Sequence, residues 1–355
     1  MSNEKVDQIL NLVKEYIDEK RKTESWNRGE DWVNYSGPYY SSDEYTSAIK
    51  ILLSEWLIFG KEARHFENVF PEHLGKRYGV LTNSGSSANL LMANVFKSKS
   101  LAMKKFHMPP GSKFITPVVC FPTTINPLIQ AGYEPVFVDV DLPSMNLNLD
   151  EVEAELEKDP NIRAITFAHV LGNPPNMDRL MALVEKYNLN FLEDSCDALG
   201  SYYDGKKLGS FGLISTCSFF PAHHMTMGEG GFAATSNARI RKVLASIRDW
   251  GRACYCNERK PGDVTAGTAC GDRFQEWLND GKNKICYDHR YVFDEIGFNT
   301  KPLDLQAAMG LHQLDKLPEM DEARRKNFKR MERTFSKYED FFMLPRATEK
   351  ADPCW

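Results

Sequence analysis

The chain has 355 residues, of which 26% are charged, and a formal net charge of -5. This length exceeds the ~250–300 residues at which a single hydrophobic core stops growing, so we expect one large domain and part of a second. The charges are mixed and form no broad basic region, which argues against nucleic acid as a main partner. The chain also has no apolar run of ~18 residues, so we expect no membrane span. We expect a cytoplasmic protein, in which the eight cysteines stay reduced rather than form disulfides.

In chain order, residues 1–44 are predicted to form an N-terminal helical segment. Its start, MSNEKVDQILNLVKEYIDEKRK, is a charged amphipathic helix rather than a signal peptide. A large domain is predicted over residues 45–300, because from about residue 75 short apolar strands alternate with segments of helical spacing. This alternation predicts an α/β fold with a mostly parallel central sheet and helices on both faces.

Two later segments break this alternation. Residues 258–284 are rich in glycine, proline and charge, which indicates an insert on the surface of the large domain. Residues 302–338 carry apolar side chains at intervals of three and four, which predicts a long helix. We expect this helix to lead into a small C-terminal α/β domain, of which residues 301–355 provide only the beginning, as in a truncated chain.

Polar segments follow several of the predicted strands, at the sheet edge where α/β proteins bind ligands. Gly85, Ser86 and Ser87 begin a helix and suit a phosphate, although taken alone such a stretch is more often simple helix capping. Phe121 offers a ring that can stack on a planar cofactor, unless it is a core aromatic. Asp194 can bond to a protonated heterocyclic nitrogen, or it can cap the next helix.

Five motifs, in this order, resemble the DegT/DnrJ/EryC1/StrS sugar aminotransferase-like family of fold type I pyridoxal phosphate (PLP) proteins. They are NSGSSANLL, FPTTINPLIQAGYEPVFVDVD, EDSCDALGS, SFFPAHHMTMGEGG and IGFNTKPLDLQAAMGLHQLDKL, and the resemblance runs from about residue 45 to the end. It implies a homodimer in which Ser86, Ser87 and Ser218 hold the cofactor phosphate of one subunit while Asn299 reaches it from the other.

His223 stands where this family has the lysine that binds the cofactor covalently, and the alignment of SFFPAH favours it over His224. An imidazole can move a proton but cannot hold the cofactor covalently, so we expect the enzyme to use pyridoxamine phosphate (PMP). The alternative is an inactive transaminase with a structural histidine. The nearest lysines, at positions 206, 207 and 242, lie outside the motif.

Within the family, the chain resembles 3-dehydratases that act on nucleotide-linked 4-keto-6-deoxyhexoses in 3,6-dideoxyhexose and lipopolysaccharide biosynthesis. RDWGRACYC and YDHRYVFDEIGFN favour the branch that acts on a CDP-linked sugar and carries a [2Fe–2S] cluster. The resemblance implies that His223 removes a proton from the cofactor's C4′ carbon as the C3 hydroxyl leaves, and that Asp194 keeps the pyridine nitrogen protonated. The alternative is the cluster-free branch that acts on GDP-4-keto-6-deoxymannose.

The four cluster ligands implied by this branch have counterparts in the chain, at Cys196, Cys254, Cys256 and Cys270. Thirteen residues separate the last two, a longer interval than the branch shows. On spacing alone, a zinc site or unrelated buried thiols fit as well as a cluster. A cluster passes one electron at a time, and the resemblance implies a separate flavin and iron–sulfur reductase as the electron donor.

The other four cysteines lack matching positions and are predicted to be small core residues. They are Cys120, Cys217, Cys286 and Cys354. Two other classes of function stay open at this point: a non-catalytic, zinc-bearing scaffold on the same fold, and an ordinary aminotransferase, which the missing lysine disfavours. The sequence does not identify the nucleotide or the configuration of the sugar.

Overall fold

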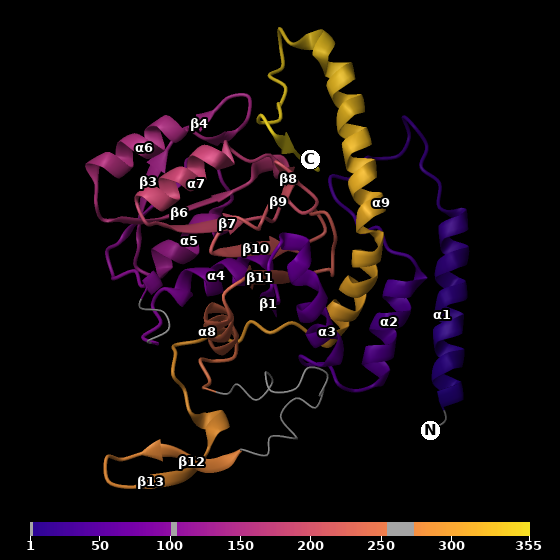
Figure 1. Ribbon diagram of the computed structural model, residues 1–355. Coiled ribbons are helices and arrows are strands. Elements are labelled where there is room, and N and C mark those ends of the chain that lie inside the picture. Colours follow the sequence, from indigo (N-terminus) through magenta and orange to yellow (C-terminus); the bar gives the residue numbers. More distant parts are fainter. Residues whose placement is uncertain (1–2, 101–104, 254–272) are drawn as a thin grey trace.

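The computed structural model describes residues 3–100, 105–253 and 273–355, and is organised around a seven-stranded sheet of order β1-β11-β10-β7-β6-β2-β3 (Figure 1). Its strands are β1 (Tyr78–Thr82), β2 (Lys113–Pro117), β3 (Glu134–Val138), β6 (Ile162–Ala168), β7 (Asn190–Asp194), β10 (Ile214–Ser218) and β11 (Gly231–Thr235). Neighbouring strands are parallel except where β11 pairs with β1 and β10. The predicted mostly parallel sheet is therefore confirmed.

Helices cover both faces of this sheet, because apolar side chains alternate between its two sides. Phe114 and Leu192 pack into a cluster with α4, α5 and α8, whereas their neighbours Ile115 and Phe191 pack against α6 and α7 on the opposite face. These helices are α4 (Gly85–Val95), α5 (Pro122–Gln130), α6 (Leu149–Lys158), α7 (Met177–Lys186) and α8 (Ala238–Arg248).

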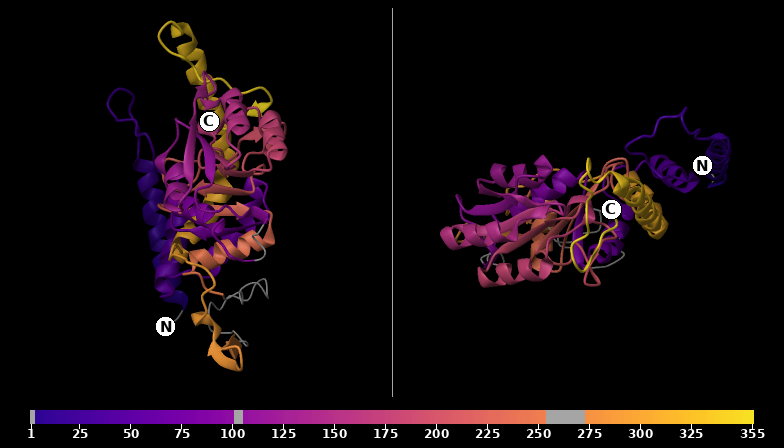
Figure 2. Two further views of the ribbon diagram at one scale, coloured as in Figure 1. Left: turned by 90° about the vertical axis from the view of Figure 1, so that its left-hand side faces the viewer. Right: turned by 90° about the horizontal axis from the view of Figure 1, so that it is seen from above.

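The predicted long helix is α9 (Asp304–Phe335), and it holds the N-terminal helices against the large domain. The Asp304 carboxylate accepts hydrogen bonds from the backbone N–H groups of Gly60, at 3.0 Å, and Ala63, at 2.9 Å, so it caps α3 (Lys61–Val69). Buried Glu44 of α2 (Ser42–Leu53) accepts bonds from Gln313 and Lys316 of α9. Figure 2 shows the predicted N-terminal helix, α1 (Asn3–Thr23), at the outer edge of the molecule.

Part of the predicted surface insert falls outside the described residues, and the rest belongs to a hairpin that projects away from the sheet in both figures. Its strands, β12 (Phe274–Asn279) and β13 (Lys284–Asp288), are largely exposed, as expected for an insert on the surface. Cys286 lies on β13 and is exposed, so the prediction that it is a core residue is wrong. Cys217 and Cys354 are buried as predicted, and Cys120 is partly buried.

The last described residues return to the large domain. A short strand, β14 (Ala351–Asp352), pairs with β8 (Tyr202–Tyr203), and the Trp355 ring stacks on Phe328 of α9 with ring centroids 3.7 Å apart. The remaining short strands are β4 (Val140–Asp141), β5 (Asn146–Leu147), β8 (Tyr202–Tyr203), β9 (Lys206–Lys207) and β14 (Ala351–Asp352). The boundaries of the predicted domains stay a prediction. In the described part of the chain, no helix is long and apolar enough to cross a membrane.

A buried carboxylate fixes the centre of the sheet. Glu193 of β7 is fully buried and accepts hydrogen bonds from His169 (3.1 Å), Ser215 (3.2 Å) and the backbone N–H groups of Gly209 and Gly212. Burial by itself would raise the pKa of this carboxyl, but the hydrogen bond from His169 and the charges of His169 and Lys76 hold the pKa below its ordinary value. The ionised form is therefore the stable one in the folded protein.

We predict that Glu193→Gln destabilises the fold by about 3–5 kcal/mol at neutral pH, because the amide donates where the carboxylate only accepts. Urea unfolding of the variant and of the wild type measures the difference. A depressed folded pKa contributes stability above the unfolded pKa of about 4.3, and this stability is lost as pH falls. The difference between the two proteins should therefore shrink at acid pH. The exposed Glu134→Gln is the control, and equal stability of all three proteins would contradict the prediction.

Candidate active site

The polar segments singled out in the sequence meet at the carboxyl ends of four strands, as predicted. They follow β1, β2, β7 and β10. In the sheet, β10 lies next to β7 on one side, and β2 is the second strand from β7 on the other side. Parallel strands bring their carboxyl ends to one edge, so residues far apart in the chain share a site there.

The helix start at Gly85 is packed directly on the end of β10. A Cβ atom on Gly85 would lie 2.5 Å from the Cβ of Ser218, and one on Gly231 would lie 2.1 Å from the Ser84 carbonyl oxygen, so only glycine fits at either position. Ser84, which sequence reasoning did not select, is the N-cap and accepts a bond from the Ser87 N–H at 3.1 Å. The helix leaves the N–H groups of Gly85 and Ser86 without an intrahelical acceptor, an arrangement that fits a phosphate.

Asp194 lies at the end of β7 and is held from three sides. Its Oδ2 accepts hydrogen bonds from the side chains of Asn89 (3.0 Å) and Thr124 (2.8 Å), and its Oδ1 accepts one from the Cys196 N–H (3.2 Å). Thr216 in turn donates to Asn89 at 2.6 Å. No helix follows β7 directly, so the alternative of a helix cap is wrong. The network orients a buried carboxylate, as a bond to a protonated ring nitrogen requires.

Sequence reasoning missed the three residues that orient Asp194. Asn89 and Thr124 both lie inside motifs quoted above, in SSANLL and FPTT. Asn89 had a usable signal, because an amide on the side of a helix that otherwise carries Ala88, Leu91 and Met92 needs a buried partner. Thr216 gave no such signal, since threonine is common in strands.

Phe121 follows β2 and begins α5 as its N-cap residue. Its side chain is not part of the core, because the residue is 68% exposed. The alternative of a core aromatic is therefore wrong, and the exposed residue stands at the sheet edge, where a planar group can stack on its ring.

His223 lies in the loop between β10 and β11, and its ring is oriented by a carboxylate. Asp197 accepts a bond from His223 Nδ1 at 3.1 Å, and Arg324 of α9 donates to the His223 carbonyl oxygen at 2.9 Å. A carboxylate only accepts, so Nδ1 carries a proton, and in the neutral ring Nε2 then has the lone pair of a base. Sequence reasoning missed Asp197, although it is part of the quoted EDSCD.

The adjacent His224 is buried, and burial, followed by the nearby charge of Arg324, lowers its pKa to about 3. It is therefore neutral, and within the described residues its ring nitrogens have no carboxylate partner of the kind that His223 has in Asp197. Lys207 lies on β9, where it donates to the Glu72 carbonyl oxygen at 2.9 Å. This contact therefore gives no support to the idea that Lys207 takes the place of the cofactor-binding lysine.

The remaining predicted residues are Asn299 and the cluster cysteines. Asn299 is exposed and forms an isolated backbone β-bridge with Asp249, and its contact with a cofactor in a second subunit stays a prediction. Of the predicted cluster ligands, Cys196 is partly buried beside Asp194, whereas Cys254, Cys256 and Cys270 lie outside the described residues. Among the described residues, no group of three or more potential metal ligands occurs.

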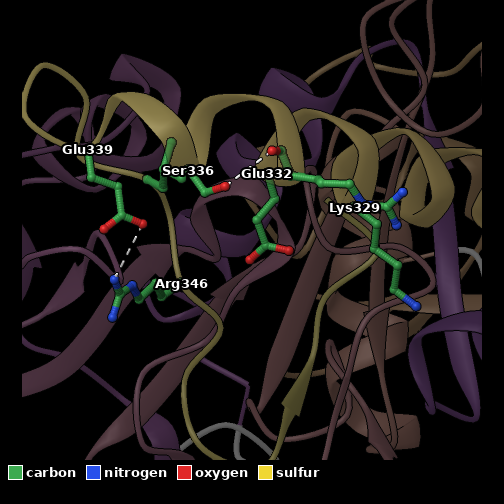
Figure 3. Close-up of a pocket in the computed structure, with 7 residues that line it drawn as sticks. Lys329, Glu332, Ser336, Glu339 and Arg346 are labelled. Carbon is green, nitrogen blue, oxygen red and sulfur yellow. Dashed lines mark hydrogen bonds and ion pairs between the residues drawn. The ribbon is translucent and has the colours of Figure 1, made fainter.

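A hollow of about 590 Å³ lies away from this edge, between the end of α9 and the segment that follows it. Figure 3 shows Lys329 and Glu332 on α9 and Ser336 directly after its end, with Arg346 facing Glu339. None of the predicted site residues lines it. The hollow is open and carries charges of both signs, and we assign it no role in the chemistry.

Three comparisons place this geometry among known proteins. The sequence model of the DegT/DnrJ/EryC1/StrS aminotransferase family matches residues 38–355. The chain is 40% identical to the lipopolysaccharide biosynthesis protein RfbH of Salmonella typhimurium, over 98% of the chain and 77% of RfbH. It is 39% identical to the dTDP-4-dehydro-2,6-dideoxy-D-glucose 3-dehydratase of Saccharopolyspora spinosa, over 98% of the chain and 72% of that enzyme.

Among solved structures, the fold resembles GDP-4-keto-6-deoxy-D-mannose-3-dehydratase of E. coli with bound hydrated PLP. The TM-score is 0.76 at 28% identity, over 92% of this chain and 78% of the other. The expected fold type I architecture is thereby confirmed. The match of the family model and the identity to both relatives together show that the chain belongs to the DegT/DnrJ/EryC1/StrS aminotransferase family.

Proposed function

We propose that the protein is a PMP-dependent 3-dehydratase that removes the C3 hydroxyl of a nucleotide-linked 4-keto-6-deoxyhexose. The observation that carries this proposal is His223, which stands where the family has its lysine and whose ring is oriented by Asp197. Two similar proteins bear the name of a nucleotide-sugar 3-dehydratase, and RfbH bears the name of a lipopolysaccharide biosynthesis protein. This supports a role in deoxysugar and lipopolysaccharide biosynthesis, which we expect in the cytoplasm.

When bound, PMP supplies an amine that can condense with the C4 ketone and a protonated ring that can accept electrons. In our proposal, the N–H groups at the start of α4 and the hydroxyls of Ser86, Ser87 and Ser218 bind its phosphate. Phe121 covers one face of its ring, and Asp194 accepts a hydrogen bond from its ring nitrogen. Close packing of Gly85 on Ser218 supports this assignment, because it brings these donors together.

His223 is the proposed catalytic base. Its Nε2 takes the proton from C4′ and, in its protonated form, can return a proton to the hydroxyl that leaves from C3. Asp197 keeps the ring in the correct tautomer and stabilises the imidazolium that forms. Unlike the family's lysine, an imidazole does not become covalently bound to the cofactor, so His223 stays available as a base in every turnover.

We further propose a [2Fe–2S] cluster held by Cys196, Cys254, Cys256 and Cys270, with a separate flavin and iron–sulfur reductase as the electron donor and a homodimer as the active form. The position of Cys196 supports the cluster, since it follows β7 directly and lies beside Asp194. A cluster there would supply single electrons for the reduction that must follow loss of the hydroxyl. The resemblance to the cluster-containing branch favours a CDP-linked substrate.

The alternative is a cluster-free enzyme that acts on GDP-4-keto-6-deoxymannose, and the similarity to the solved E. coli structure supports it. An absorption spectrum of anaerobically purified protein separates the candidates. Visible absorption of an iron–sulfur cluster supports the first proposal, and PMP absorption alone supports the cluster-free enzyme. A colourless protein that contains zinc would support a scaffold.

We predict that His223→Lys allows PLP to be bound covalently, because a primary amine replaces an imidazole at the position of the family's lysine. Borohydride reduction in the presence of PLP, followed by peptide mapping, should find the cofactor on residue 223 of the variant and on no residue of the wild type. Dehydration should fall at least tenfold, since the free base is lost. Covalent labelling of a lysine in the wild type would contradict the assignment of His223.

We predict that Asp197→Asn slows the exchange of solvent deuterium into C4′ of bound PMP by roughly tenfold to a hundredfold, with PMP affinity unchanged. The amide can still accept from Nδ1, but it no longer stabilises the imidazolium. Exchange is measured by mass spectrometry after addition of a nucleotide-linked 4-keto-6-deoxyhexose. Asp204→Asn, in an exposed turn, is the control. An unchanged exchange rate in Asp197→Asn would remove Asp197 from the mechanism.

We predict that Cys254→Ser or Cys256→Ser bleaches the visible absorption and abolishes reductive turnover, yet leaves deuterium exchange at C4′ intact. Proton removal needs only His223 and the cofactor, whereas reduction needs the cluster. Cys286→Ser, at an exposed position on β13, should keep both absorption and turnover. Full reductive turnover in the Cys254 and Cys256 variants would favour the cluster-free alternative.

A further inference from the structure

His224 is a buried histidine whose hydrogen-bonding capacity is unused. It is 4% exposed, and within the described residues neither Nδ1 nor Nε2 has a hydrogen-bond partner. A buried polar group without a partner costs about 1–3 kcal/mol, so a side chain with two such atoms needs a reason to stay there. A leucine of similar size would fill the same space without this cost.

The charge state of His224 limits what it can bind. Because its pKa lies near 3, the ring is neutral at physiological pH and presents one N–H donor and one lone-pair acceptor. A phosphate or carboxylate could use only the donor, and an ammonium group could use only the acceptor. A hydroxyl group can use either nitrogen, since it both donates and accepts.

His224 lines a cavity of about 370 Å³, and His223 lines the same cavity. The walls come from the loop after β10, from α9 and from residues 34–39 of the N-terminal segment. This volume lies in the range of small-molecule sites. Thr226 and Gln313, which also line the cavity, are bonded to each other or to other protein groups, so they are already satisfied.

Further polar groups around the cavity remain available to a ligand. Asn34, Ser36 and Asn327 line it and offer amide and hydroxyl groups. Arg324 also lines it, and in the described part of the chain it donates hydrogen bonds to the backbone oxygens of His223, at 2.9 Å, and Trp355, at 3.3 Å. The lining is thus rich in uncharged donors and acceptors, as a polyhydroxylated ligand requires.

We propose that this cavity holds the hexose of the nucleotide sugar, and that the His224 ring forms a hydrogen bond with one of its hydroxyl groups. The inference rests on the proposed function, which requires the C3 and C4 atoms of the hexose to lie beside His223. Since His223 and His224 line one cavity, a hexose placed against His223 occupies the cavity that His224 lines, and the His224 ring, whose nitrogens are covered in this structure, must turn toward the hexose to bond it. His224 is then a residue of substrate recognition, and it leaves proton transfer to His223.

The test compares His224→Leu with the wild type, both loaded with PMP. Isothermal titration calorimetry measures the affinity for free nucleotides and for CDP-glucose, dTDP-glucose and GDP-mannose, and the sugar that binds the wild type most tightly is the probe. We expect His224→Leu to weaken binding of that probe about tenfold, the effect of one lost buried hydrogen bond. Affinity for the matching free nucleotide should not change.

Two further variants make the result interpretable. His224→Gln keeps a donor and an acceptor, and should bind the probe more tightly than His224→Leu even if leucine disturbs the fold. His73→Leu replaces a partly buried histidine that stacks on Phe70 outside the cavity, and should bind like the wild type.

Equal affinity of wild type and His224→Leu would mean that the cavity holds water only, and equal loss for nucleotide and nucleotide sugar would mean a structural role. Either result overturns this inference alone. A wild type that binds none of the three sugars would overturn the proposed function and this inference with it.

Discussion

The buried carboxylate of Glu193 is the interaction on which the site depends. It ties β7 to the loop that contains Gly209 and Gly212 and to His169 on the neighbouring strand end, so the centre of the sheet cannot shift without breaking several charged hydrogen bonds. Side chains alternate along a strand, so the next residue, Asp194, faces the opposite side, toward α4 and α5. Glu193 thus holds β7 in place on one face of the sheet, while Asp194 contacts Asn89 and Thr124 on the other face.

The site then combines rigid and adaptable parts. Thr124, Asp194, Asn89 and Thr216 form a chain of hydrogen-bonded, buried side chains on secondary-structure elements, which suits the proposed role of Asp194 in holding one atom of a cofactor in place. His223 and Asp197 lie on loops and are partly exposed. The proposed base, which would collect a proton and deliver it elsewhere, benefits from such a position, since small ring movements do not disturb the core.

Much of this could be predicted from the sequence, and the failures have physical causes. The strands were predictable because both faces of the sheet are apolar, and the positions of Asp194 at the end of β7 and of His223 after β10 were predictable because their motifs are local. The pairing of Asp197 with His223 joins residues 26 positions apart, and that of Asn89 with Asp194 joins residues 105 apart. Such contacts depend on tertiary structure that a local pattern does not specify. Cys286 was misjudged for a related reason, because the letters KICYD do not reveal that nothing in the described chain covers that strand.

The contacts of α9 also set an order for folding. The cap of α3 comes from Asp304, and the partner of Glu44 in α2 is Gln313, 269 positions later. During synthesis, residues 42–69 therefore leave the ribosome long before the groups that stabilise them exist. Loops of this length close slowly, and exposed apolar surface persists until they do. We expect the first helices of the chain to be the last to acquire native contacts, and a nascent chain that stops short of α9 to be a target for chaperones.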